Sequence, residues 1–279
     1  MMQISNSWLE LNIKAPSEKN EVISAYFTDY TLGNHIEDDC IKMYFDFKDK
    51  EEVELIVCDI RSSFEIENMS WSAINEENWM ENWMENFHPV KILDKVLIIP
   101  DWNNENYNSI YTVKIHPAMA FGTGHHASTQ LIVEHMINYR VGKYDSLLDL
   151  GCGSGILSFL SKKMGVKNVT AIDVDPICEE NFYKNSKLND INDINFSIQD
   201  VHQFKNYNFN VIIANIDKKN IIKIINKFES QNTESILMIA GFLYKDRDQI
   251  LGHLKTTYAD HVSKKGEWGS MVIKRKIIE

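Results

Sequence analysis

The chain has 279 residues, of which 44% are hydrophobic, so it can bury a full core without disulfides or a structural metal. Its 29 basic against 40 acidic residues give a net charge of −11, which disfavours nucleic acid as a direct substrate and suits a basic protein partner. The four cysteines are dispersed, so we expect neither a zinc site nor disulfides. The sequence has no apolar run near ~18 residues and no signal pattern, so we expect no membrane span and a cytoplasmic location.

Residues 1–72 are predicted to form a small α+β domain. Apolar and polar residues alternate along several short segments, which is typical of half-buried strands. We expect strands at 8–13, 35–38, 41–47 and 64–71, with helices after Pro16-Ser17 and over 50–61. The resulting order β-α-β-β-α-β is the ferredoxin-like pattern.

Residues 73–88 are predicted to form a linker helix. Trp79, Trp83 and Phe87 recur at i, i+4 and i+8 and so share one helix face. They form either an aromatic ladder for a ligand or the buried face of a connector helix, and the second interpretation is favoured. His88-Pro89 would end the helix.

From residue 89 onwards the pattern changes to alternating strands and helices. That alternation indicates a parallel sheet with helices on both faces. The expected strands cover 146–150, 168–172, 194–198, 210–214 and 236–240, and an amphipathic strand closes the sheet at 267–275. Residues 89–279 are therefore predicted to form a doubly wound domain.

A glycine-rich turn follows the first of these strands, in the segment Asp-Leu-Gly-Cys-Gly-Ser-Gly at 149–155. Gly151 and Gly153 would let the backbone approach a ligand closely. A dinucleotide-binding turn requires a third glycine where this chain has Ile156. The carboxylate of Asp149 would repel a pyrophosphate and suits an amino group and a sulfonium. The turn thus predicts binding of S-adenosylmethionine.

Three more polar residues stand at strand ends, where ligands bind in open parallel sheets. Asp173 follows Gly151 by 22 residues and is expected to accept hydrogen bonds from the ribose, although a solvated turn is the alternative. Asp200 is expected either to accept the adenine amino group or to lie in a solvated turn. Asn215 can bind the cofactor or an incoming amine, or form an Asx turn.

A loop and helix start precede the glycine turn. Ser128 and Thr129 are placed to bind the carboxylate of the cofactor. Phe121, between an alanine and a glycine, is expected to form a mobile lid. His125-His126 could suggest a metal, but adjacent histidines point apart and no third ligand is evident, so no metal is predicted.

Segments 120–129, 148–155 and 214–216 resemble the PrmA family, methyltransferases of ribosomal protein 11 of the large subunit. The Phe-Gly-Thr-Gly-His-His stretch is the most specific part, and the resemblance is stronger after about residue 75. It implies a ferredoxin-like substrate-recognition domain, the linker helix, and a seven-stranded, Rossmann-like class I methyltransferase domain. One departure is Asp217, where the family more often has an apolar or neutral residue.

The resemblance implies cofactor contacts at Thr129, Gly151, Asp173 and Asn215, and a mobile aromatic at Phe121. The implied reaction methylates lysine side chains of ribosomal protein 11, with its N-terminal amine as a further acceptor. Alignment of the sulfonium and the amine would supply catalysis, with Asn215 near the amine.

Two alternatives remain at the sequence level. A methyltransferase of the same fold could act on another protein or a small molecule, although a small molecule needs no separate recognition domain. A binding protein could use the fold without catalysis, but the intact turn at 149–155 together with Asp173 argues against it.

Overall fold

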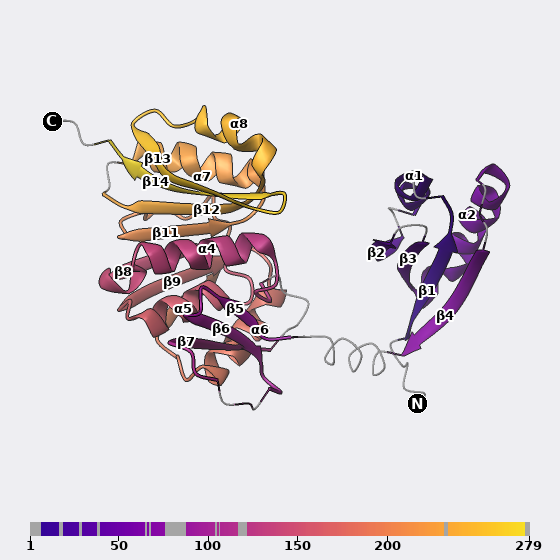
Figure 1. The fold of residues 1–279 in the computed structure, drawn as a ribbon, viewed down its shortest axis with the longest axis horizontal. Coiled ribbons are helices and arrows are strands. Elements are labelled where there is room, and N and C mark those ends of the chain that lie inside the picture. Colours follow the sequence, from indigo (N-terminus) through magenta and orange to yellow (C-terminus); the bar gives the residue numbers. More distant parts are fainter. Residues whose placement is uncertain are drawn as a thin grey trace. The chain divides into compact units, whose positions relative to one another are not determined.

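The computed structural model describes residues 7–16, 19–27, 30–37, 40–64, 66, 68–75, 88–103, 105, 107–116, 122–231 and 234–276. The chain divides into two compact units, residues 1–87 and 88–279 (Figure 1). The aromatic residues of the predicted linker helix, Trp79, Trp83 and Phe87, lie outside the described residues, and so does Phe121.

The first unit is a four-stranded antiparallel sheet with two helices. Its elements are β1 Ser7–Lys14, α1 Asn20–Ala25, β2 Thr31–Glu37, β3 Cys40–Asp46, α2 Lys50–Ser63 and β4 Asn68–Asn75. The strands lie in the order β2-β3-β1-β4. The alternating Leu9, Leu11 and Ile13 point to one face, where they pack with apolar residues of both helices. The element order is the one that the sequence predicts.

The last strand of this unit begins later than expected. We predict a strand at 64–71, but β4 covers Asn68–Asn75. Phe64 instead ends α2, because its backbone N–H donates to the carbonyl of Ile60. The apolar side chain of Phe64 packs against the core in that position, so its hydrophobic character gave a false signal for a strand start.

The second unit contains a seven-stranded sheet, which confirms the predicted architecture. The strands are β8 Ser146–Leu150, β9 Asn168–Asp173, β10 Ile194–Ile198, β11 Val211–Asn215, β12 Ile236–Leu243, β13 Thr257–Lys265 and β14 Trp268–Arg275. Their order is β10-β9-β8-β11-β12-β14-β13. Strands β8 to β12 are parallel to one another, and β14 runs antiparallel between β12 and β13.

Five helices accompany this sheet among the described residues. They are α4 Ala127–Asn138, α5 Ile156–Met164, α6 Ile177–Leu188, α7 Lys218–Ser230 and α8 Arg247–Leu251. Helices α5, α6 and α7 connect parallel strands, α4 precedes β8, and α8 follows β12. Apolar residues of α7, such as Ile221 and Phe228, form a core with Leu148 and Ile212 of the central strands. In the part of the chain that the structure describes, no helix is long and apolar enough to cross a membrane.

A second, smaller sheet precedes the large one and is absent from the sequence prediction. It comprises β5 Val90–Ile92, β6 Val96–Pro100 and β7 Tyr111–Ile115, with β6 in the middle. The short apolar run at 96–99 gave no period by which to recognise a strand. Strand β13 is also missing from the prediction, because it forms an edge and carries mostly exposed polar residues.

Candidate functional site

A cavity of about 770 Å³ lies in the second unit, at the carboxyl ends of the parallel strands. This volume falls within the usual range for small-molecule sites, roughly 300–1,000 Å³. Its lining residues end or follow the strands β8 to β11, or come from the start of α4 and from α6, α7, β12 and β14. They are His126, Ser128, Gly151, Gly153, Asp173, Val174, Asp175, Cys178, Asp200, Val201, His202, Asn215, Ile216, Asp217, Asn220, Gly241 and Trp268. Five of the residues predicted to bind the cofactor, Gly151, Gly153, Asp173, Asp200 and Asn215, thus lie around one cavity.

The glycine turn forms one wall of this cavity. Gly151 has a φ of 76°, and a Cβ atom there would lie only 2.4 Å from the Cγ2 atom of Ile216. The backbone N–H groups of Gly151 and Cys152 both donate to the carbonyl of Ile172 in the next strand. Ile156, where a dinucleotide-binding turn would have glycine, is buried at the start of α5. The backbone is therefore held at the cavity by local geometry that glycine alone accepts.

Asp173 connects the end of β9 to the glycine turn. Its Oδ2 atom accepts a hydrogen bond from the N–H of Gly153 at 2.8 Å, and its Oδ1 atom accepts one from Asp175 at 3.0 Å. Each carboxylate oxygen can accept a second hydrogen bond. Asp173 can therefore organise the turn and still accept ligand hydroxyl groups in the cavity.

Two other aspartates of the cavity stabilise local turns. Asp200 accepts from the N–H of His202 at 2.8 Å, so it lies in a turn and lines the cavity at the same time. Asp217 is the N-cap of α7, and its Oδ1 atom accepts from the N–H groups of Lys219 and Asn220. This capping role explains why Asp217 stands where the PrmA family more often has an apolar or neutral residue.

Asn215 ends β11 and reaches the first turn of α4. Its Nδ2 group donates to the Oγ1 atom of Thr129 at 3.2 Å. Its Oδ1 atom is buried and has no hydrogen-bond partner among the described residues. Thr129 itself is buried and does not contribute to the described cavity lining, whereas its neighbour Ser128 does. Thr129 thus reaches the site through Asn215.

His126 and Trp268 complete the cavity wall, a role that sequence reasoning missed. Their ring centroids are 4.4 Å apart and the planes cross at 68°. Burial lowers the pKa of His126 below its usual range, which favours the neutral ring. Within the described ranges, no three His, Cys, Asp or Glu side chains are grouped to hold a metal ion. His126 therefore acts as a helix cap and an aromatic wall.

Asp149 lies behind the glycine turn and is not among the described residues that line the cavity. It is almost fully buried, and its Oδ2 atom accepts a hydrogen bond from the hydroxyl of Ser158 at 2.6 Å. Its Oδ1 atom has no partner among the described residues. Burial raises the pKa of Asp149 to about 7, although the Ser158 hydroxyl opposes this change.

Comparisons with known proteins agree on one family. A family model described as "Ribosomal protein L11 methyltransferase (PrmA)" matches residues 11–276. The ribosomal protein L11 methyltransferase of Thermosipho melanesiensis is 30% identical over 265 residues, which cover 92% of this chain and 94% of that protein. The Bacillus subtilis protein of the same name is 33% identical over 226 residues, covering 73% and 67%.

Other relatives match over a smaller part of their length. The matching region spans 65% of the Clostridium perfringens ribosomal protein L11 methyltransferase, with 28% identity over 205 residues and 72% of this chain. A solved structure of ribosomal protein L11 methylase from Lactobacillus delbrueckii subsp. bulgaricus is 26% identical with a TM-score of 0.63. That similarity covers 68% of this chain and 100% of the solved one.

Proposed function

Because the chain belongs to the ribosomal protein L11 methyltransferase (PrmA) family, we propose that it methylates amino groups of ribosomal protein L11 with S-adenosylmethionine as the methyl donor. The acceptors are lysine side chains, with the N-terminal amine as a further acceptor. The observation that carries this proposal is the cavity that joins Gly151, Gly153, Asp173 and Asn215 at the carboxyl ends of the parallel strands.

The residues of the cavity fit S-adenosylmethionine. Asp173 offers acceptor positions for ribose hydroxyls, and Asp200 offers one for an adenine amino group. The Oδ1 atom of Asn215, which has no hydrogen-bond partner in the described ranges, is a buried acceptor that a donor from the ligand would satisfy. Gly151 and Gly153 leave no side chain between the backbone and the ligand.

The bound cofactor supplies an electrophilic methyl group on a sulfonium, and the protein must align an amine with it. A lysine amine has an ordinary pKa near ~10.4 and must lose its proton before it can attack. Trp268 and His126 form a partly apolar wall, and desolvation by such a wall lowers an amine pKa. The Asn215 carbonyl oxygen can accept a hydrogen bond from the neutral amine and so orient its lone pair.

Recognition of ribosomal protein L11 is assigned in this proposal to the first unit, residues 1–87. The predicted boundary between domain and linker helix at residues 72 and 73 falls inside β4, whose last residues pair with β1. Every described residue of the cavity lies in the second unit, so the first unit is free for another role. The net charge of −11 favours association with a basic partner through long-range attraction.

Methyl transfer to purified proteins tests the proposal. Tritiated S-adenosylmethionine should label ribosomal protein L11, and mass spectrometry should place the label on amino groups. Labelling of a different ribosomal protein, with L11 unlabelled, would show that the acceptor is wrong while the methyltransferase assignment holds. Lack of cofactor binding would contradict the whole proposal.

Replacement of Asp173 by alanine should weaken cofactor binding. Loss of charged hydrogen bonds, each contributing roughly 1.5–3 kcal/mol, predicts at least a tenfold higher dissociation constant. The N–H of Gly153 would also lose its acceptor, which loosens the turn. Isothermal calorimetry on the folded variant measures the effect. Asp145→Asn, which changes an exposed carboxylate at the other end of β8, is the control. Unchanged affinity in Asp173→Ala would remove this residue from the site.

Replacement of Asn215 by alanine should reduce turnover more than stability. Among the described residues the side chain has one hydrogen bond, to Thr129, and no partner for Oδ1, so a folded variant is expected. We expect kcat for methylation to fall by about tenfold with a change in unfolding free energy below about 1 kcal/mol. Thermal melts measure the stability of the variant, and initial rates measure its turnover. A collapsed melting temperature with full activity of the folded fraction would favour a purely structural Asx role.

A further inference from the structure

Three asparagines recur at every fourth position along α6 and its C-cap: Asn181 and Asn185 in the helix and Asn189 directly after it. We call them the asparagine ladder. All three are almost fully buried, and Asn185 has 0% exposure. Spacing by four residues places them on one helix face, ~6 Å apart along the axis. A buried amide costs free energy unless it is hydrogen-bonded, so the partners of the ladder show what it holds in place.

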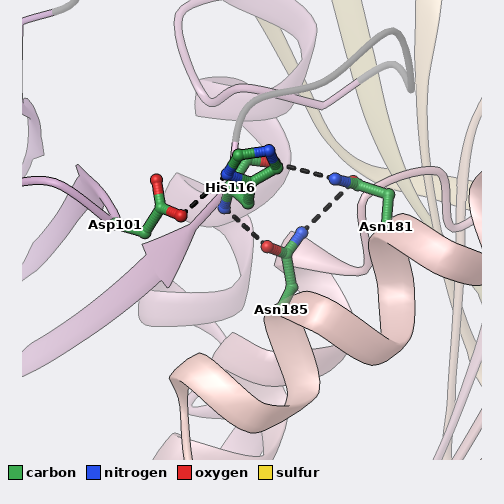
Figure 2. A network of polar contacts seen from close by, with 4 residues as sticks. All are labelled: Asp101, His116, Asn181 and Asn185. Carbon is green, nitrogen blue, oxygen red and sulfur yellow. Dashed lines mark hydrogen bonds and ion pairs between the residues drawn. The ribbon is translucent and has the colours of Figure 1, made fainter.

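The ladder binds the backbone of Lys114 in β7, an edge strand of the small sheet, and of His116, which follows that strand. Asn189 accepts from the N–H of Lys114 at 2.9 Å and donates to its carbonyl at 2.6 Å. The N–H of His116 donates to Oδ1 of Asn185 at 2.6 Å, and Nδ2 of Asn181 donates to the His116 carbonyl at 2.8 Å (Figure 2). Two residues of an extended strand span ~6.6 Å, which is close to the ~6 Å repeat of the ladder. The asparagine side chains therefore form the backbone hydrogen bonds that a neighbouring strand would otherwise form.

One member of the ladder also contacts the glycine turn. Asn185 donates through Nδ2 to the carbonyl of Ser154 at 2.9 Å, and the Ser154 hydroxyl donates to the carbonyl of Gly122 at 2.6 Å. Gly122 has a φ of 109°, and a Cβ atom there would lie 2.7 Å from the Ser154 Oγ atom. Ser154 is thus joined to Gly122 directly and to His116 through Asn185. His116 and Gly122 are the residues directly before and directly after 117–121 in the sequence.

Asp101 fixes the His116 ring from the opposite side. Figure 2 shows the two asparagines pointing from α6 toward His116, with Asp101 across from them. The Nδ1 atom of His116 and the Oδ2 atom of Asp101 are 2.7 Å apart. Backbone and ring of His116 are therefore both held. Neither Asn185 nor His116 belongs to the described lining of the cavity, so they act on the site through other residues.

We propose that Asn185 is a positioning residue, which holds the glycine turn and the residues leading into α4 in one arrangement for methyl transfer. This inference rests on the proposed function. Both connected segments carry residues of the cavity, Gly153 on one side and Ser128 on the other. A displacement of about 1 Å far from the reacting atoms can lower a rate by about 100-fold.

A matched pair of variants tests the proposal in the full-length protein. Asn185→Asp and Asn189→Asp each keep the size of the side chain and replace a buried N–H donor by a carboxylate oxygen, but only Asn185 contacts the glycine turn. We expect similar losses of melting temperature for both. In Asn185→Asp we expect kcat for ribosomal protein L11 to fall about tenfold and the cofactor dissociation constant to rise about tenfold. In Asn189→Asp both quantities should change by less than about twofold. Equal losses in both variants, or an unchanged kcat in Asn185→Asp, would overturn the proposal.

A third variant covers the case in which Asn185→Asp does not fold. Ser154→Ala removes only the hydroxyl that binds the Gly122 carbonyl, and we expect a folded protein with kcat about fivefold lower. Wild-type kcat in Ser154→Ala would then overturn the proposal.

Hydrogen exchange without cofactor separates this inference from the proposed function. Asn185→Asp or Ser154→Ala should speed exchange at the N–H groups of Gly153 and Gly155, and Asn189→Asp should not. This result is independent of methylation. Failure of the wild-type protein to methylate L11 would count against the proposed function, whereas unchanged exchange in the turn would count against the positioning role.

Discussion

A fragment of residues 88–279 is expected to bind S-adenosylmethionine as tightly as the full chain but to methylate ribosomal protein L11 more slowly by a factor on the order of 100 or more. All described residues of the cavity lie in this fragment. The two units also have separate cores: one cluster draws on residues between Leu9 and Ile60, the other on residues between Leu148 and Ile273. Removing the first unit should therefore leave the second folded.

The slower rate would follow from lost affinity and lost orientation of the protein substrate. Calorimetry measures cofactor binding, and initial rates at several L11 concentrations measure both kcat and KM. Circular dichroism must first show that the fragment is folded. A folded fragment that methylates L11 at the full-length rate would contradict the assignment of substrate recognition to the first domain.

Replacing Asp149 by asparagine should stabilise the protein relative to the wild type by an amount that grows as pH rises from about 4 to about 7. Burial raises the pKa of this carboxyl from 3.8 to about 7. Between these values the unfolded chain loses the proton and the folded protein retains it, so stability falls as pH rises from about 4 to about 7. The full difference corresponds to ~4 kcal/mol. Asparagine keeps an acceptor for the Ser158 hydroxyl and has no proton to lose.

Urea denaturation of the wild type and Asp149→Asn between pH 4 and pH 8 measures the effect. The variant should gain up to ~4 kcal/mol relative to the wild type across this range. Asp145→Asn, which removes an exposed carboxylate in a surface ion pair, is the control and should follow the wild-type pH dependence. Parallel curves for Asp149→Asn and the wild type would show that the carboxyl ionises normally in the folded state.

The parallel strands and the glycine turn could be predicted because their signals are local. Apolar runs that end in Gly151, Asp173 and Asn215 identify strand ends, and strand ends of a parallel sheet lie on one side. Asp149 shows the limit of such reasoning. Its neighbour Leu150 ends the strand, and the sequence did not reveal that the Asp149 carboxyl points away from the cavity toward Ser158.

Other parts of the site depend on topology that no local pattern reveals. Trp268 reaches His126 only because β14 inserts between β12 and β13, next to the helix that His126 caps. The spacing of Asn181, Asn185 and Asn189 is visible in the sequence. Its meaning depends on the small sheet, which was not predicted, because the ladder binds Lys114 of β7 and His116, the residue that follows this strand.

The cavity wall combines segments that are distant along the chain, from His126 at the N-cap of α4 to Trp268 in β14. Contacts of such long sequence separation close slowly and late during folding. A ligand that binds only the completed cavity favours the native state, by about 2.7 kcal/mol at a concentration 100 times its dissociation constant. The level of S-adenosylmethionine would thus set how strongly the second unit resists unfolding and proteolysis, while the separate core of the first unit gains no such protection.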